Sequence, residues 1–126
     1  MASNELTAVK GLYEWASREA DAVFLGRGSQ TASFTFHFRE GSRAISVFTM
    51  YADGRMTVNY EYLSKTVDVE QLQAFDHLLR RHAPFDRMPR KTTGFVSVSV
   101  KDMVLAGEAS VAHLKDSVLS LRPKRE

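Results

Sequence analysis

The spacing of hydrophobic residues changes twice along this chain. Over residues 4–22, apolar side chains from Leu6 to Ala20 recur every three or four positions. That period is typical of an amphipathic helix with one buried face. Glycines at 26 and 28 then interrupt the pattern, so we expect the helix to end before them and a tight connection to follow.

From Ser33 the period shortens to two, which is typical of strands with one buried face. Phenylalanines alternate with polar residues over 34–39, and residues 55–63 alternate in the same way. Between them, residues 44–51 are apolar on both faces, as in a central strand. Asp53-Gly54 favours a type I′ hairpin turn. The pattern predicts a three-stranded antiparallel meander over residues 33–63.

The C-terminal half is predicted to be mainly helical. A helix over residues 69–82 has Asp68 as its N-cap, and a last helix covers 108–121. Residues 95–100 alternate like a short strand, after which Ser99 can cap one helical turn. The fold class is therefore α+β, with helices packed on one face of the meander and the order αβββα(β)αα. We expect one domain over residues 1–126 with a basic C-terminal tail at 122–126.

If helices cover only one face of the meander, the other face is at least partly open. The alternation places polar side chains on that open face, notably His37, Arg39, Arg55, Thr57 and Asn59. A half-exposed sheet always has a polar side, so an ordinary solvated surface explains them. The alternative, a binding surface, also stays open.

Composition describes an ordinary globular domain. Of the 126 residues, 44% are hydrophobic and 25% are charged, far from the balance that leaves chains disordered. The chain has no cysteine, which excludes disulfides and thiolate metal sites and fits a reducing compartment. No apolar run approaches the ~20 residues that span a bilayer. We expect a cytoplasmic protein without membrane partners.

The net charge of +2 hides an asymmetry between the two parts of the chain. Residues 1–79 hold 7 Lys/Arg against 10 Asp/Glu, whereas residues 80–126 hold 10 against 5. A basic segment binds polyanions by releasing counterions, although a solvated loop has the same composition. The residues we consider for nucleic-acid or anion binding are Arg27, Arg80, Arg81, Arg87, Arg90 and Lys91.

The sequence contains no motif for catalysis, a cofactor or a metal. Among the four histidines, only His77 and His82 are close in sequence, and a spacing of five places them on different faces of a helix. No Gly-x-Ser-x-Gly elbow occurs, and no acidic residue precedes a lysine by two positions, as metal-dependent nucleases need. We predict no metal and no cofactor, and favour a non-catalytic protein over an enzyme.

The run Gly-Arg-Gly-Ser-Gln-Thr-Ala-Ser-Phe at 26–34, the strand at 45–51 and Asp-Gly-Arg-Met-Thr-Val-Asn-Tyr at 53–60 resemble a known family. It comprises small accessory domains of unassigned role, found alone or fused C-terminally to predicted restriction-type nucleases in prokaryotes. The resemblance implies a nucleic-acid-associated role in restriction or defence. The matching polar positions are Arg27, Ser33, Arg55 and Asn59, and no catalytic residue is implied.

The sequence thus leaves three hypotheses. The first is a non-catalytic accessory module associated with nucleic acid. The second is a protein-interaction or self-associating domain, such as a homodimer, that uses the open sheet face or an edge strand. The third is a small-ligand domain or enzyme with a pocket near His37.

Overall fold

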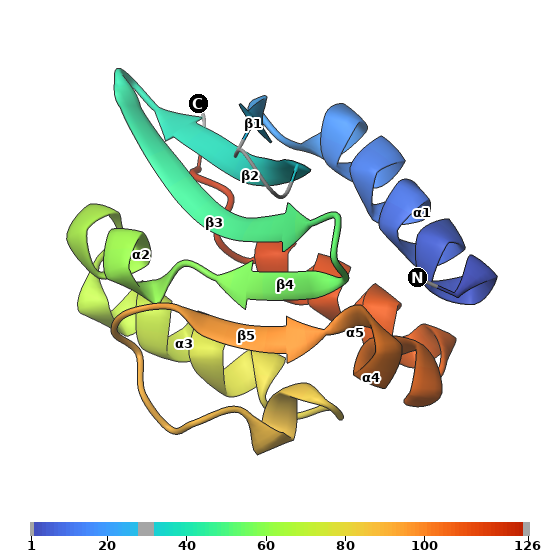
Figure 1. The fold of residues 1–126 in the computed structure, drawn as a ribbon. Helices are drawn as coiled ribbons and strands as arrows, with labels where there is room; N and C mark the ends of the chain where they lie inside the picture. The colour runs from blue at the N-terminus through green and yellow to red at the C-terminus, as the bar shows by residue number, and fades with distance from the viewer. Residues whose placement is uncertain (1, 28–31, 125–126) are drawn as a thin grey trace.

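A five-stranded antiparallel sheet with helices around it forms the framework of the protein (Figure 1). A computed structural model describes residues 2–27 and 32–124. The elements in chain order are α1 (Ser3–Glu19), β1 (Ala22–Arg27), β2 (Ala32–Glu40), β3 (Arg43–Tyr51), β4 (Arg55–Val58), α2 (Tyr60–Thr66), α3 (Val69–Leu79), the 3-10 turn η1 (Phe85–Arg87), β5 (Val96–Ser99), α4 (Val100–Leu105) and α5 (Glu108–Leu119).

The α+β class is confirmed, but the sheet has two strands more than the predicted meander. The strands lie side by side in chain order, from β1 at one edge to β5 at the other. β1 occupies residues 22–27, which we assigned to the end of the first helix and to a glycine loop. The helix α1 therefore ends earlier than predicted, at Glu19. β5 joins the sheet by pairing with β4, with Met56 opposite Val98. The predicted caps are present, since Asp68 accepts from the Gln71 N–H and Ser99 from the Asp102 N–H.

A β-bulge in β3 sets which side chains face which side of the sheet. Phe36 lies opposite Phe48, whereas the next residue, His37, lies opposite Ser46, so Val47 is the extra residue. Val47 and Phe48 are both buried in the hydrophobic core. The strand itself is present, but the prediction that its two faces are equally apolar and buried is therefore wrong. Its apparent lack of alternation comes from the bulge.

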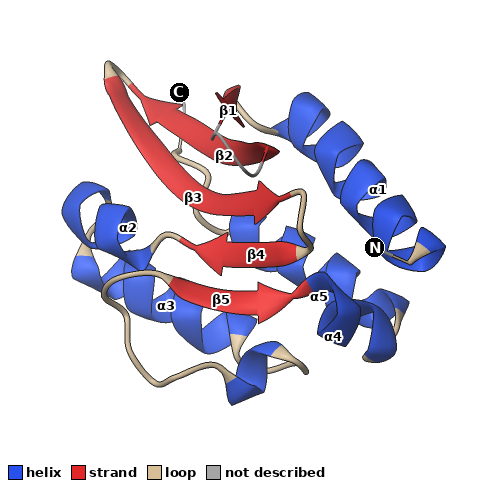
Figure 2. Ribbon diagram, viewed as in Figure 1, coloured by secondary structure: helices blue, strands red, loops and turns tan. Residues whose placement is uncertain are grey.

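Aromatic stacking joins α1 to the sheet. The Phe36 ring stacks on Trp15 of α1 with centroids 5.2 Å apart and on Phe48 of β3 at 5.5 Å. Side chains from α3, α4 and α5 complete the same core, and Figure 2 shows α3 and α5 behind the sheet. Most helices thus cover one face, as predicted.

The exception is α2, which the sequence did not predict. Alternation over residues 55–63 suggested a strand, but β4 ends at Val58 and the chain turns into a helix at Tyr60. The Asn59 N–H donates to the bulge carbonyl of Val47 at 3.0 Å. The Asp53-Gly54 turn also differs from type I′, because only Gly54 has a positive φ.

Buried polar contacts fix α2 against α3. The Tyr60 hydroxyl donates to Asp76 Oδ1 at 2.5 Å, and Arg80 Nε donates to the same oxygen at 2.8 Å. Burial raises the pKa of Tyr60 far above its usual range, and the contact with the Asp76 carboxylate raises it further. Tyr60 therefore stays neutral and acts as a donor.

Truncating Phe36 tests the assignment of the core. Phe36→Ala should lower the free energy of unfolding by about 3–5 kcal/mol, because it removes a fully buried ring and leaves a cavity. Urea unfolding followed by circular dichroism measures the loss. Phe95→Ala is the control, since Phe95 is 52% exposed and its truncation should change stability by no more than about 0.5 kcal/mol. Equal losses would contradict the assignment.

Candidate functional site

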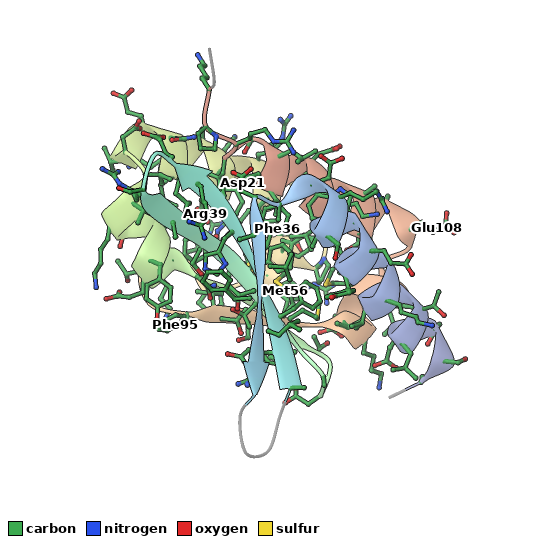
Figure 3. The ribbon with its side chains drawn as sticks, turned by 90° about the horizontal axis from the view of Figure 1, so that it is seen from above. Asp21, Phe36, Arg39, Met56, Phe95 and Glu108 are labelled. Atoms are coloured by element: carbon green, nitrogen blue, oxygen red, sulfur yellow. The ribbon has the colours of Figure 1, made fainter. Side chains whose placement is uncertain are left out.

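The open face of the sheet is a hollow rather than a flat surface. It has a volume of about 870 Å³ and is lined by residues from all five strands, from α2 and from the segment before β5. Figure 3 places Phe95 on the side of the sheet opposite Phe36 and the core. We call this hollow the sheet groove. Its lining comprises Phe24, Ser33, Thr35, His37, Ala44, Ser46, Thr49, Tyr51, Arg55, Thr57, Asn59, Tyr62, Lys65, Thr66, Phe95 and Ser97.

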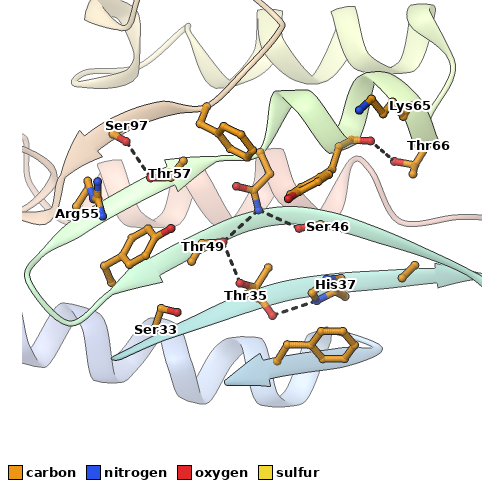
Figure 4. Close-up of a pocket in the computed structure, with 16 residues that line it drawn as sticks. Ser33, Thr35, His37, Ser46, Thr49, Arg55, Thr57, Lys65, Thr66 and Ser97 are labelled. Carbon is orange, nitrogen blue, oxygen red and sulfur yellow. Dashed lines mark hydrogen bonds between the residues drawn. The ribbon is translucent and has the colours of Figure 1, made fainter. Parts of the chain in front are cut away.

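Hydroxyl groups, including those of Thr35, Ser46 and Thr49, form the floor of the sheet groove (Figure 4). Asn59 donates hydrogen bonds to two of them. Asn59 Nδ2 donates to Ser46 Oγ at 2.9 Å and to Thr49 Oγ1 at 3.2 Å. Thr49 Oγ1 lies 2.9 Å from Thr35 Oγ1. A separate pair, Thr57 Oγ1 and Ser97 Oγ, lies 2.8 Å apart. Each hydroxyl has one donor and two acceptor positions, so the floor keeps capacity for further hydrogen bonds.

His37 is the buried titratable group of the sheet groove. Only 7% of the residue is exposed, and Phe24 packs against its ring with centroids 4.2 Å apart. Its Nδ1 lies 3.3 Å from the Thr35 carbonyl oxygen. Because a carbonyl can only accept, Nδ1 is the protonated nitrogen in this contact, and Nε2 of the neutral ring is an acceptor. Burial lowers the pKa of His37, and the positive charge of Arg39 lowers it further.

Aromatic rings and cations surround the hydroxyl floor. The rings of Phe24, Tyr62 and Phe95 are each about half exposed, at 50%, 48% and 52%. The Arg55 guanidinium lies over the Tyr51 ring, 4.2 Å from its centroid. Lys65 lines the groove from α2 and pairs with Glu61 outside it at 3.3 Å. Among the described lining residues there is no carboxylate, so the groove is basic.

The structure brings together most of the predicted open-face residues. His37, Arg55, Thr57 and Asn59 all line the sheet groove, whereas Arg39 is exposed outside its lining. We expected these side chains to be solvent-exposed, but His37, Thr57 and Asn59 are at most 7% exposed because the floor is recessed. The prediction missed the contributions of α2 and of the strands β1, β3 and β5. Polar residues at 46, 49 and 51, out of phase with an apolar run, were the available signal.

The predicted basic segment lies apart from the sheet groove, around a second hollow. Arg81, Arg90 and Lys91 line it together with Asp76 and Asp86. The two carboxylates offset part of its positive charge. Arg87 is exposed and lies 3.9 Å from Asp86. The side chain of Arg27, the remaining predicted anion contact, lies outside what the structure describes.

Arg80 has a structural role in that segment. Besides Asp76, its guanidinium donates to the carbonyl oxygens of Met88 and Pro89, both at 2.7 Å, and of Lys91 at 3.3 Å. Its side chain is 15% exposed. These contacts hold the loop after η1 against α3 and occupy the donors that a phosphate would need. In the predicted basic tail, Arg122 similarly donates to the carbonyl and carboxylate oxygens of Glu19.

Residues 2–27 and 32–124 contain neither a cluster of metal ligands nor a candidate membrane span. No group of three or more His, Asp or Glu side chains is arranged to hold a metal ion. None of the helices in that part of the chain has the length and apolar character to cross a membrane.

Comparison of this chain with protein-family models, with curated proteins and with solved structures found no match.

Removing the amide of Asn59 tests whether it holds the groove floor together. Asn59→Ala should lower the free energy of unfolding by about 1–3 kcal/mol, because the recessed hydroxyls of Ser46 and Thr49 on β3 lose their donor. Chemical denaturation measures it. Ser64→Ala is the matched control, since Ser64 is exposed on α2 and donates to the Glu61 carbonyl. Its loss should stay within about 0.5 kcal/mol, and a similar loss in both variants would count against this role of Asn59.

Titration of His37 should destabilise the protein in acid. Burial holds the pKa of His37 in the folded state below its usual value of 6.5, so the unfolded chain binds the proton more tightly. The contribution of His37 to stability is complete above pH 6.5 and is lost as the pH falls toward the folded pKa. The slope from this one proton is at most about 1.4 kcal/mol per pH unit.

The measurement is the free energy of unfolding between about pH 8 and pH 5, for the wild type and for His37→Gln. The wild type should lose more stability below pH 6.5 than the variant, which lacks the titrating ring. Parallel curves would show that the folded state does not disfavour the protonated ring.

Proposed function

We propose that this domain is a non-catalytic binding module that holds single-stranded nucleic acid in the sheet groove. The observation that supports the proposal is the lining itself, which combines exposed rings, cations and hydroxyls without a carboxylate. Surfaces that bind single strands combine a basic groove for the backbone with aromatic rings for the bases.

Size favours a strand over a single nucleotide. The groove is lined by all five strands of the sheet, and neighbouring strands lie about 4.8 Å apart. From β1 to β5 the floor therefore spans roughly 19 Å, which is longer than one nucleotide.

The rings and the cations suit different parts of such a ligand. Phe24, Tyr62 and Phe95 offer half-exposed faces on which bases can stack, an interaction that does not depend on base identity. Arg55 and Lys65 line the same groove and attract phosphates. Hydroxyl groups both donate and accept, so the floor suits several bases. We expect little sequence preference.

This proposal retains the first hypothesis from sequence, a non-catalytic module associated with nucleic acid, and changes the surface that makes the main contact. The main contact is the open sheet face, with Arg81, Arg90 and Lys91 as a secondary basic surface. The prokaryotic restriction or defence setting, and a cytoplasmic location, rest on the sequence resemblance and composition alone. They are part of the proposal.

Binding of fluorescently labelled oligo(dT) and oligo(U), measured by anisotropy over about 50–200 mM salt, tests it. Affinity should fall steeply as salt rises. Arg55→Ala should lower affinity and reduce the slope of log K against log salt by about 0.7, the value for one lost phosphate contact. Phe95→Ala should weaken binding roughly 5- to 150-fold, the equivalent of about 1–3 kcal/mol of stacking.

The matched control is Lys101→Ala, because Lys101 is an exposed cation on α4, outside the groove lining. It should leave both affinity and slope unchanged. Absence of binding at the lowest salt would refute the proposal. If charge reversal at Arg81 and Arg90 abolished binding while Arg55→Ala did not, the second hollow would be the site, and the proposal for the sheet groove would be wrong.

A further inference from the structure

The first strand leaves one edge of the sheet open. β1 pairs with β2 on one side, from Ala22 opposite His37 to Arg27 opposite Ala32. On its other side, no strand of the described chain pairs with it. Figure 3 looks down on this edge, and no helix is drawn across β1. Its backbone groups are therefore available to a further strand.

The sequence of β1 lacks the usual protection of an edge. Natural edges are blunted by charged residues, prolines, bulges or short length. Within β1, residues 22–26 include no charged residue and no proline, and Arg27 at the end of the strand is its one charged residue. β1 pairs with β2 over six residues without a register shift. β5 at the opposite edge is four residues long, contains two serines and runs directly into α4. The two edges are thus not equivalent.

Two large apolar side chains are exposed on opposite faces of β1. Phe24 is 50% exposed and lines the sheet groove, whereas Leu25 is 62% exposed and borders an apolar hollow against α1. Consecutive residues of a strand point to opposite faces. A helix docked on one face would cover only one of them. A strand added to the edge covers both.

We propose that β1 pairs antiparallel with β1 of a second copy of this chain, about a two-fold axis at Phe24. In this register Phe24 lies opposite its own counterpart, and Val23 lies opposite Leu25 of the other copy. The residues that meet in this register, Val23, Phe24 and Leu25, are apolar and uncharged, so the contact brings no like charges together, and a two-fold contact is self-complementary.

Pairing would join the two sheets into one and bring the two grooves together. Because Phe24 lines the sheet groove, the two Phe24 rings meet where the grooves adjoin. A ligand that extends beyond one groove would reach the second, which raises affinity through effective concentration. The pairing itself does not depend on the ligand, so it stands or falls separately from the proposed function.

The mass in solution is the first test. Light scattering should give twice the chain mass of 14.2 kDa for the wild type. Leu25→Lys should give the monomer, because it places a charge on both copies at the new contact. Leu105→Lys is the matched control, since Leu105 is 74% exposed on α4, and this variant should remain a dimer. A monomeric wild type, or a dimer that persists in Leu25→Lys, would overturn the proposal.

A cross-link tests the register, and the chain suits it because it has no cysteine of its own. Opposed Cα atoms in antiparallel pairs are about 4.5–5.5 Å apart, within the range that a disulfide bridges. Phe24→Cys should therefore form a disulfide-linked dimer under mild oxidation, whereas Leu105→Cys should not. Equal cross-linking of the two variants, or none at position 24, would refute this pairing.

Discussion

The docking of Asn59 on the bulge of β3 is the constraint on which the open face depends. Val47 adds one residue to β3, and its carbonyl accepts the Asn59 N–H as the chain leaves β4. The Asn59 side chain then bonds Ser46 and Thr49, the two polar residues on either side of the bulge. Asn59 therefore lies where β4 ends and α2 starts, and its side chain donates hydrogen bonds to hydroxyls of the groove floor. Without Asn59, the end of β4, the start of α2 and the hydroxyls of the groove floor would lose the hydrogen bonds that they share.

The two faces of the sheet are stabilised in different ways. On the helix side, stability comes from apolar burial around Phe36, which depends on volume and packing density. On the groove side, it comes from polar groups that satisfy one another in a recessed floor, which depends on the geometry of hydrogen bonds. Arg80 stabilises a loop outside the sheet in the same way, because its guanidinium donates hydrogen bonds to the backbone carbonyl oxygens of that loop. A cluster of basic residues in sequence is thus divided between structural and surface roles.

Sequence reasoning succeeded where one physical signal was dominant. The phenylalanines at 34, 36 and 38 are buried, as their alternation indicated, and the caps at Asp68 and Ser99 follow from local hydrogen bonding alone. β1 was missed because Ala22 to Gly26 is a short apolar run without alternation, which continues the helical pattern before it. α2 was missed because Tyr60 and Tyr62 continue the alternation of β4, while the break at Asn59 depends on a carbonyl twelve residues away.

The candidate site was predictable where it depends on the local alternation of polar and apolar residues. Side chains on β2 and β4 could be assigned to the open face, since period-two alternation is a local property. The contribution of β3 was missed, because the bulge shifts its phase and the polar residues at 46, 49 and 51 do not follow a single period of two. The recess of the floor, and with it the burial of His37, depends on α2 and on the segment before β5. Those contacts are long-range.

The single tryptophan of the chain has a spectroscopic consequence. Trp15 is stacked on Phe36 on the helix side of the sheet, with Lys115 near its ring, and is nearly inaccessible to water. The sheet groove lies on the opposite side. Indole emission from this protein will therefore follow the separation of α1 from the sheet during unfolding, and will be nearly silent toward whatever occupies the groove.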